Sequence, residues 1–423
     1  MNKTAVALAA DSAITINNRS GPKIYNSANK LFALSKYRPV GAMVYSSASL
    51  AGVPWETIIK IYRLDLGEKS FKTINEYAHD FLKYLDKSKN LFPARQQEIY
   101  ASSVFGSVLK TITRDIESMV DKHFASGKTL KKSDVVKIIT SSLSKEFKEW
   151  SNAPYCEGIN KKFQNSIKKK YKKQFEKLIP QILEKLPLSA IHKKTLLEIA
   201  AMSLSRSLNA GSSSGVVIAG FGQNQIFPAL HACTIRGVIN DKLIFCNVDK
   251  NEVAFDNSSI IMPFAQREMV SMFVEGVEPE YNDFVSAYQN KILRDFPQLI
   301  VNQLSGHIPA NAVNKLKKQL DKASGQILKK LNADLSGYRR TYHIGPLLDA
   351  VSVLPKDELA AMAESLVNLT SFKRRVSLEA ETVGGPIDVA VISKGDGFIW
   401  ISRKHYFDPK FNPQFVNNYT RNE

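Results

Sequence analysis

A carboxylate and an ammonium lie near the start of the chain, each at the boundary of a short apolar run. Asp11 follows Ala5–Ala10, and Lys30 precedes Leu31–Ser35. Apolar runs this short are typical of buried strands, so we expect both charges at strand ends. An ammonium beside a hydroxyl lowers the pKa of that hydroxyl, and a carboxylate orients and neutralises the ammonium. Asp11 and Lys30 are therefore candidates for the supporting half of a nucleophilic catalytic site.

Each of these residues also has a common structural explanation. An aspartate at a strand end often bonds its own backbone in a turn, and a lysine at a strand entry is often solvated. A third run, Val40–Ser46, follows a proline-containing connection typical of a hairpin. We therefore expect three strands to open the fold, with Asp11 and Lys30 at their ends.

The length and composition indicate a folded protein with more than one structural unit. At 423 residues the chain exceeds the usual size of one hydrophobic core. Cys156, Cys233 and Cys246 are too few and too scattered for a disulfide framework, which favours a reducing compartment. The first residues make a poor signal peptide, and no apolar run approaches the ~20 residues that cross a bilayer. We therefore predict a cytoplasmic protein without a membrane partner.

The positive charge is concentrated in one helical segment. The formal net charge is +18, and Lys161–Lys177 holds eight lysines and one glutamate. Such a face attracts nucleic acid, anionic lipid or an acidic protein without specifying any of them, and it is also typical of a solvated helix surface. Phe163, Ile167, Tyr171 and Phe175 recur at helical spacing between the lysines and predict a packed stripe.

The remaining pattern alternates between helical blocks and strands. Helical spacing extends from 55 to 206, around 264–273, from 280 to 340 and around 355–369. Strands are predicted at 216–219, 229–239, 243–248, 387–392 and 398–402, with turns at Asn240-Asp241 and Asp396-Gly397. Antiparallel hairpins separated by helical blocks predict an α+β protein.

Two predicted strands carry residue types that can bind a metal. His231 and Cys233 point to one face of a predicted strand, and Cys246 lies on the next. The closely spaced ligand pairs of zinc sites are missing, so we expect buried structural roles and neither a metal nor a cofactor.

The order of several short motifs resembles proteasome β-subunits and the bacterial proteasome-like protease, which are N-terminal-nucleophile (Ntn) hydrolases. The motifs are Ala9-Ala-Asp-Ser12, Lys30 before a strand, Gly41-Ala-Met43, Pro263-Phe-Ala-Gln266 at a helix start, and Gly384-Gly385 before the last hairpin.

The resemblance implies a fold and a segmentation. The fold would be a four-layer αββα sandwich of two antiparallel sheets with large helical insertions. Its core would comprise 1–64, 212–280 and 346–408, with a lysine-rich helical segment at 65–211, a basic helical insertion at 281–345 and a polar tail at 409–423.

The resemblance also implies a reaction, peptide or amide hydrolysis by an N-terminal threonine whose own α-amino group is the base. Asp11 and Lys30 match the supporting pair. Tyr45, with Ser46 and Ser47, matches the oxyanion and substrate cleft. A ring-like homo-oligomer and a peptide substrate are implied as partners.

This sequence departs from the family in ways that bear on activity. Ten residues precede Asp11, too few for the nucleophile strand, and Thr4 lies too close to Asp11 to replace it. Ala380 and Val383 stand where the family has polar residues that hold the terminal amine, with Glu379 or Glu381 as possible substitutes.

Two interpretations follow. The chain is a hydrolase homologue whose nucleophile is missing from the sequence as printed, or it is an inactive scaffold that oligomerises and recruits an anionic partner through its lysine-rich helices.

Overall fold

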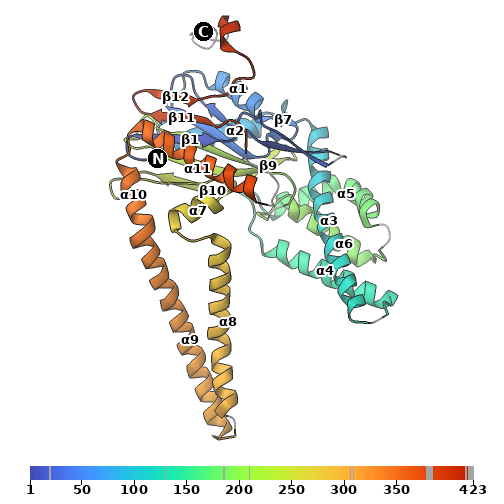
Figure 1. The fold of residues 1–423 in the computed structure, drawn as a ribbon. Helices are drawn as coiled ribbons and strands as arrows, with labels where there is room; N and C mark the ends of the chain where they lie inside the picture. The colour runs from blue at the N-terminus through green and yellow to red at the C-terminus, as the bar shows by residue number, and fades with distance from the viewer. Residues whose placement is uncertain are drawn as a thin grey trace.

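The short apolar runs form antiparallel sheets. The computed structural model describes residues 1–18, 21–127, 129–183, 186–208, 210–304, 306–307, 309–377, 384–414 and 417. It is an α+β protein, as the strand and helix patterns predicted. Figure 1 shows the sheets stacked at one end of the molecule, with two helical extensions that leave them in different directions.

The two ends of the chain build the smaller sheet. Its strand order is β1 (Ala5–Ala10), β11 (Asp388–Ser393) and β12 (Gly397–Ser402). β1 and β11 are antiparallel, with Ala10 opposite Asp388. Both strands are almost entirely buried, which explains their continuous apolar runs.

The larger sheet has five strands. Their order is β10 (Lys242–Glu252), β9 (Ala229–Ile239), β8 (Ser214–Gly220), β5 (Val40–Ser46) and β4 (Leu31–Ala33). The turn between β9 and β10 holds Asn240 and Asp241 at positive φ, 53° and 58°, as expected for a two-residue hairpin turn.

The opening of the chain contains more strands than the three predicted. A hairpin of β2 (Ile14–Asn18) and β3 (Gly21–Tyr25) separates β1 from β4, and two short strands, β6 (Ser49–Leu50) and β7 (Val53–Pro54), follow β5. The first hairpin was missed because its strands are short and largely polar, without the apolar run on which the prediction depended.

The two larger sheets pack face to face. Val6 and Leu8 of β1 contact a cluster that includes Met43, Val217 and Leu230 of the five-stranded sheet. A Cβ on Gly41 would lie 2.7 Å from the Ile392 side chain, so glycine permits the close approach there.

Helices cover both outer faces of this pair of sheets. α1 (Trp55–Leu66) and α2 (Ile74–Lys87) share a buried cluster with the five-stranded sheet. α10 (Gly345–Ser352) and α11 (Lys356–Val376) pack on the smaller sheet, where Val351 and Leu359 join Ala5 and Val389 in one cluster.

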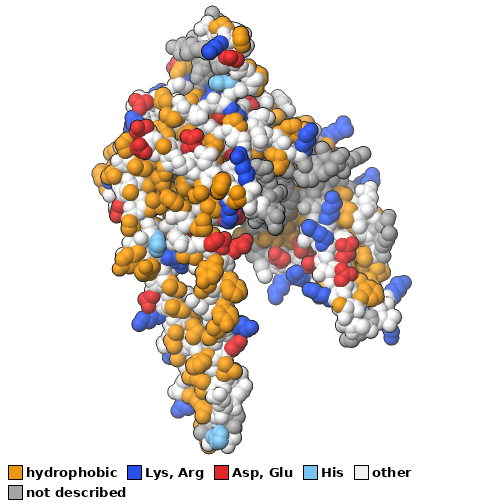
Figure 2. Space-filling model, in the orientation of Figure 1, with side chains coloured by type: hydrophobic (Ala, Val, Ile, Leu, Met, Phe, Trp, Pro, Cys, Tyr) orange, Lys and Arg blue, Asp and Glu red, His pale blue; other side chains and the backbone are white. Residues whose placement is uncertain are grey.

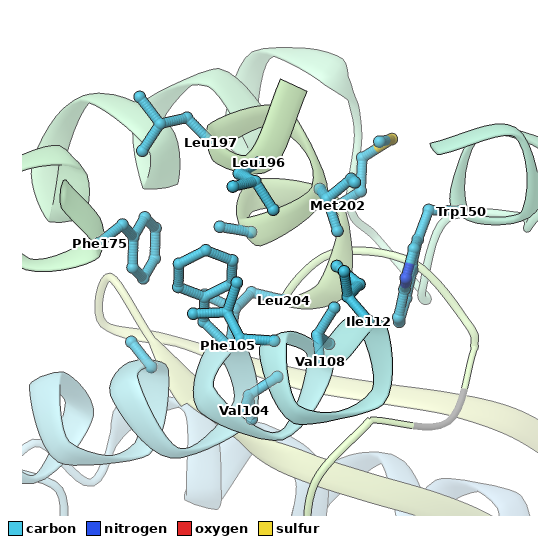
Figure 3. Close-up of a cluster of buried hydrophobic side chains, with 14 of the residues drawn as sticks. Val104, Phe105, Val108, Ile112, Trp150, Phe175, Leu196, Leu197, Met202 and Leu204 are labelled. Carbon is cyan, nitrogen blue, oxygen red and sulfur yellow. The ribbon is translucent and has the colours of Figure 1, made fainter. Parts of the chain in front are cut away.

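A separate helical block has its own core. It consists of α3 (Ala94–Ala125), α4 (Lys132–Asn152), α5 (Lys161–Leu183) and α6 (Ala190–Ser203). Figure 3 shows Phe105, Phe175 and Leu196 meeting in its centre. Tyr171 and Phe175 of the predicted stripe are buried. Pro180 lies inside α5, which continues to Leu183.

A disulfide connects this block to the sheet, contrary to the expectation of unpaired cysteines. Cys156 precedes α5 and Cys246 lies on β10, and the two are joined although 90 residues separate them. Spacing along the chain could not indicate this pair, because the fold alone brings the two residues together.

The second extension is a long helical arm. α7 (Glu268–Glu275) leads into α8 (Pro279–Leu304) and α9 (Ala310–Arg339), which pair and end in a π-helical turn, η1 (Arg340–Ile344). The arm projects from the sheets (Figure 1). Tyr281, Phe284 and Leu299 are more than half exposed on α8, and Figure 2 shows apolar side chains along the arm.

The helix predicted at 264–273 begins later, at Glu268. Ala265 has a left-handed φ of 63°, which a right-handed helix excludes.

The segment boundaries at 64, 211, 280 and 345 stay predictions. Ala380, Val383, Glu379 and Glu381 lie outside the described residues. The tail contains a short helix, η2 (Pro409–Phe411). Among the described residues, no helix combines the length and apolarity that a bilayer crossing needs.

Candidate active site

The structure brings Asp11 and Lys30 into contact. Asp11 follows the last residue of β1, Lys30 directly precedes β4, and the Lys30 Nζ donates to Asp11 Oδ1 at 2.7 Å. Their side chains are 14% and 18% exposed. This limited exposure reduces solvent screening, so the pair is held more firmly than an ion pair in open water.

The second carboxylate oxygen of Asp11 bonds the backbone. Asp11 Oδ2 accepts from the N–H of Ala13 at 3.0 Å and from the N–H of Gly384 at 3.2 Å. The bond to Ala13 is the turn interaction expected of an aspartate at a strand end. Asp11 therefore has a structural role and also positions the Lys30 ammonium.

The Gly384-Gly385 motif lies directly beside this pair. The N–H of Ser12 donates to the Gly384 carbonyl at 3.1 Å, and the Ser12 hydroxyl donates to the Pro386 carbonyl. Gly385 has a φ of +77°, and a Cβ there would lie 2.7 Å from Asn26. Glycine is required at 385 both for its conformation and for this close approach.

Two cavities lie near the Asp11–Lys30 pair, which lines the first of them. The first, which we call the β1 slot, has a volume of about 570 Å³ and is lined by Asp11, Lys30 and the edge of β1. The second, the serine cleft, has a volume of about 980 Å³ and is lined by a group of hydroxyl residues, Ser27, Ser46, Ser47, Ser49, Ser212 and Ser213. Ile14 and Ser46 line both cavities, so the two cavities adjoin at these residues.

The three residues predicted to form the oxyanion and substrate cleft lie at this junction. Tyr45 lines the β1 slot, Ser47 lines the serine cleft, and Ser46 lines both. The N–H of Ser47 already donates to the Ser213 carbonyl at 3.2 Å, so it is engaged within the fold. Ser46 has a φ of 67°, a strained conformation for a residue with a Cβ and one that occurs often at functional sites.

Tyr45 points into the space between the sheets. Its ring lies 5.4 Å from that of Phe264, and burial raises the pKa of its hydroxyl. A Cβ on Gly215 would overlap the Tyr45 ring, at 1.8 Å. Glycine at 215 is therefore what allows Tyr45 to line the slot.

The serine cleft also holds a carboxylate that the sequence analysis did not single out. Glu56 accepts from Asn29 at 3.0 Å and from Lys60 at 2.6 Å. Although burial opposes ionisation, these two hydrogen bonds lower the pKa of Glu56. Asn29 precedes Lys30 in the chain, so the cleft carries a negative charge beside the Asp11–Lys30 pair. Glu56 belongs to a helix pattern, and nothing in that pattern indicated its place in a cleft.

The other candidates lie away from this junction. Thr4 bonds Asn2 Oδ1 at 2.8 Å at the opposite end of β1. His231 bonds Asn75 at 2.9 Å, and burial lowers its pKa to about 4. Cys233 is buried, which raises its thiol pKa to about 12. Cys246 is paired with Cys156, and the described residues hold no group of three metal-ligating side chains.

The lysine-rich helix α5 is partly paired. Lys168 forms an ion pair with Glu198, and Lys172 lies 3.8 Å from Glu176. Exposed lysines of the same helix cover its outer surface, namely Lys161, Lys162, Lys169, Lys170, Lys173 and Lys177.

No family model, curated protein or solved structure matches this chain. Its function is therefore inferred from the residues and their geometry.

Proposed function

We propose that this chain is a homologue of the proteasome-like Ntn hydrolases, with peptide or amide hydrolysis as the reaction of its fold. The contact between Lys30 Nζ and Asp11 Oδ1 carries this proposal. In this proposal the contact positions the Lys30 ammonium at one end of the β1 slot, where a nucleophile and a substrate carbonyl would meet.

The arrangement of layers supports the same proposal. Helices α1 and α2 cover the five-stranded sheet, that sheet faces the smaller one, and α11 covers the other side. We interpret this stacking as the four-layer αββα sandwich of the family, with the helical block and the arm as insertions.

The proposed chemistry assigns a role to each side chain at the junction. The nucleophile would be an N-terminal hydroxyl residue that the printed sequence does not contain. Its α-amino group would take the hydroxyl proton while the oxygen attacks the substrate carbonyl, and the leaving amine would take that proton. Lys30 would lower the pKa of the hydroxyl, and Asp11 would orient Lys30. Water would then hydrolyse the resulting ester.

The test is a hydrolysis assay with blocked fluorogenic peptides on protein purified from its native host. Replacing Lys30→Met should lower kcat by at least about 100-fold with little change in KM, because the ammonium acts on the nucleophile. Lys145→Met is the matched control, because Lys145 belongs to an exposed ion pair with Asp115 in the helical block and lines neither cavity. Equal loss in both variants would contradict the proposal, as would full activity in Lys30→Met.

A second candidate function is an inactive scaffold of the same fold that assembles into a ring-like homo-oligomer and recruits an anionic partner. The exposed lysines of α5 support it. We expect binding to heparin or single-stranded RNA that weakens steeply with salt and that is lost when Lys169, Lys173 and Lys177 are replaced by glutamine. Native mass spectrometry gives the oligomeric state. Binding that does not depend on salt would exclude the anionic partner. A protein that is monomeric and also lacks hydrolase activity would exclude the ring-forming scaffold.

A cytoplasmic location is also part of the proposal, and the Cys156–Cys246 pair makes it testable. In a reducing cytoplasm both thiols would be alkylated by iodoacetamide when cells are lysed in its presence. Recovery of the disulfide under those conditions would favour an oxidising compartment.

A further inference from the structure

Strand β1 has one free edge within the part of the chain that is described. On one side it pairs with β11, and no other strand joins it in the sheet order. At its start, the N–H and carbonyl of Ala5 bond the side chain and N–H of Asn2, at 3.2 and 3.0 Å. Ala5 therefore directs its backbone away from β11.

The backbone groups of the other β1 residues can be assigned to one side of the strand or the other in the same way. Backbone groups of every second residue point to the same side, so those of Ala7 and Ala9 also point away from β11. Beyond the β1–β11 ladder, no hydrogen bond is found for either residue among the described ones. Both residues line the β1 slot. Their N–H and carbonyl groups thus face a cavity without a partner from the described chain, and such groups strongly favour being paired.

The walls of the slot suit the two faces of an added strand. Met43, Tyr45 and Leu230 of the five-stranded sheet line one side. The opposite wall is formed by α11, through Leu359, Met362 and Leu366. A strand beside β1 would place alternate side chains against these two apolar walls.

The charges and dimensions of the β1 slot indicate which kind of segment it can bind. Among the described side chains that line the slot, those of Asp11 and Lys30 at one end are charged. Met1 also lines the slot, and its α-amino group donates to the Ile260 carbonyl at 2.8 Å, where burial lowers the pKa of that amino group to about 5. The free edge from Ala7 to Asp11 corresponds to about 13 Å at ~3.3 Å per residue. A volume of about 570 Å³ is within the range of ligand pockets. The slot therefore fits four or five uncharged apolar residues in an extended conformation.

We propose that the β1 slot binds an extended apolar segment of another polypeptide, which adds to the smaller sheet as a strand beside β1. The backbone of Ala7 and Ala9 would pair with alternate residues of the segment, and the two walls would select apolar side chains at both alternating positions. This inference rests on the free edge and the slot of β1. A strand that brought a nucleophile from upstream of Met1 to Lys30 would have to run along the same edge, because Met1 and Lys30 lie at opposite ends of β1. The inference therefore belongs with the scaffold function and not with the hydrolase.

The experiment uses the full chain and a fluorescein-labelled, end-blocked hexapeptide of alternating valine and alanine. We expect saturable binding by fluorescence anisotropy. Two further peptides carry N-methyl groups, one on the odd and one on the even residues. Only one set of N–H groups faces β1 in a paired strand, so one methylated peptide should bind at least about tenfold more weakly than the other.

Two readouts locate the bound peptide. Hydrogen exchange should slow at the amides of Ala7 and Ala9. Ala363→Phe on α11, which fills the slot, should weaken binding at least about tenfold, whereas Ala361→Phe on the exposed face of the same helix should leave it unchanged.

Several results would overturn the inference. One is equal affinity of the two methylated peptides, which would indicate an apolar pocket without strand pairing. Protection at β12, the other edge of the sheet, would place the peptide elsewhere. Absence of peptide binding would also contradict the inference. So would an Ala363→Phe variant that converts a dimer to a monomer without changing the affinity for the peptide, because the slot would then bind a second copy of this chain.

Discussion

Removing the charge of Lys30 or Asp11 should destabilise the protein through one shared interaction. The variants are Lys30→Met, Asp11→Asn and the double replacement. Asparagine keeps a carbonyl oxygen that can accept from Ala13 and Gly384, so Asp11→Asn tests the charge more than the turn.

The magnitude follows from the burial and geometry of the pair. Its separation is 2.7 Å and its side chains are 18% and 14% exposed. Exposed ion pairs contribute about 0–1 kcal/mol, and loss of one partner from a fully buried pair costs about 3–5 kcal/mol. The Asp11–Lys30 pair lies between these cases, so we expect each single variant to lose about 2 kcal/mol. Because both remove the same contact, the double variant should lose about 1–2 kcal/mol less than the sum.

Urea denaturation followed by circular dichroism measures these free energies, provided that the slopes agree among variants. The matched control is Lys145–Asp115, a pair at 3.0 Å between α4 and α3 with side chains 68% and 40% exposed. Screening by water should leave its coupling undetectable. If the coupling free energy between Asp11 and Lys30 is equally undetectable, Asp11 does not hold the Lys30 ammonium in place. The catalytic role proposed for Lys30 would then be wrong.

Three further predictions concern residues around the sheets. Ser46→Gly should stabilise the protein by about 1 kcal/mol, because glycine tolerates the positive φ; Ser49→Gly should not, and equal effects in urea denaturation would refute the strain. Lys404→Met should destabilise by about 3 kcal/mol, because it leaves the buried Asp388 unpaired; a thermal midpoint equal to that of the unmodified protein would count against this pair. Burial lowers the folded-state pKa of His231 to about 4 from 6.5, so its contribution to stability is complete above pH 6.5 and is lost as the pH falls toward 4. His231→Gln should flatten the pH dependence of the melting temperature in that window, and an unchanged slope would show that His231 is not its source.

The strands were predicted best where apolar runs are continuous and bounded by turn residues. Val40–Ser46 has the predicted bounds, because burial on both faces favours apolar side chains at consecutive positions. Ala229–Ile239 also has the predicted bounds, although it includes the buried polar residues His231 and Arg236. The turn at Asn240-Asp241 was predictable because its backbone conformation favours these residue types.

Other elements depended on contacts that local patterns do not contain. The bond from Gly384 to Asp11 joins residues 373 positions apart. The pairing of Cys156 with Cys246 and the late start of α7 likewise depend on the folded arrangement. The sequence predicted the two charges of the site, whereas the two adjoining cavities became visible only in three dimensions.

Intact-mass spectrometry of the protein from its native host, before and after treatment with a peptide epoxyketone, tests the proposed function most directly. The proposal predicts one adduct per chain, located on an N-terminal threonine, serine or cysteine, and slower labelling when Lys30 is replaced by methionine. An unmodified mass, or an adduct on an internal residue, would contradict an N-terminal-nucleophile site at Asp11 and Lys30.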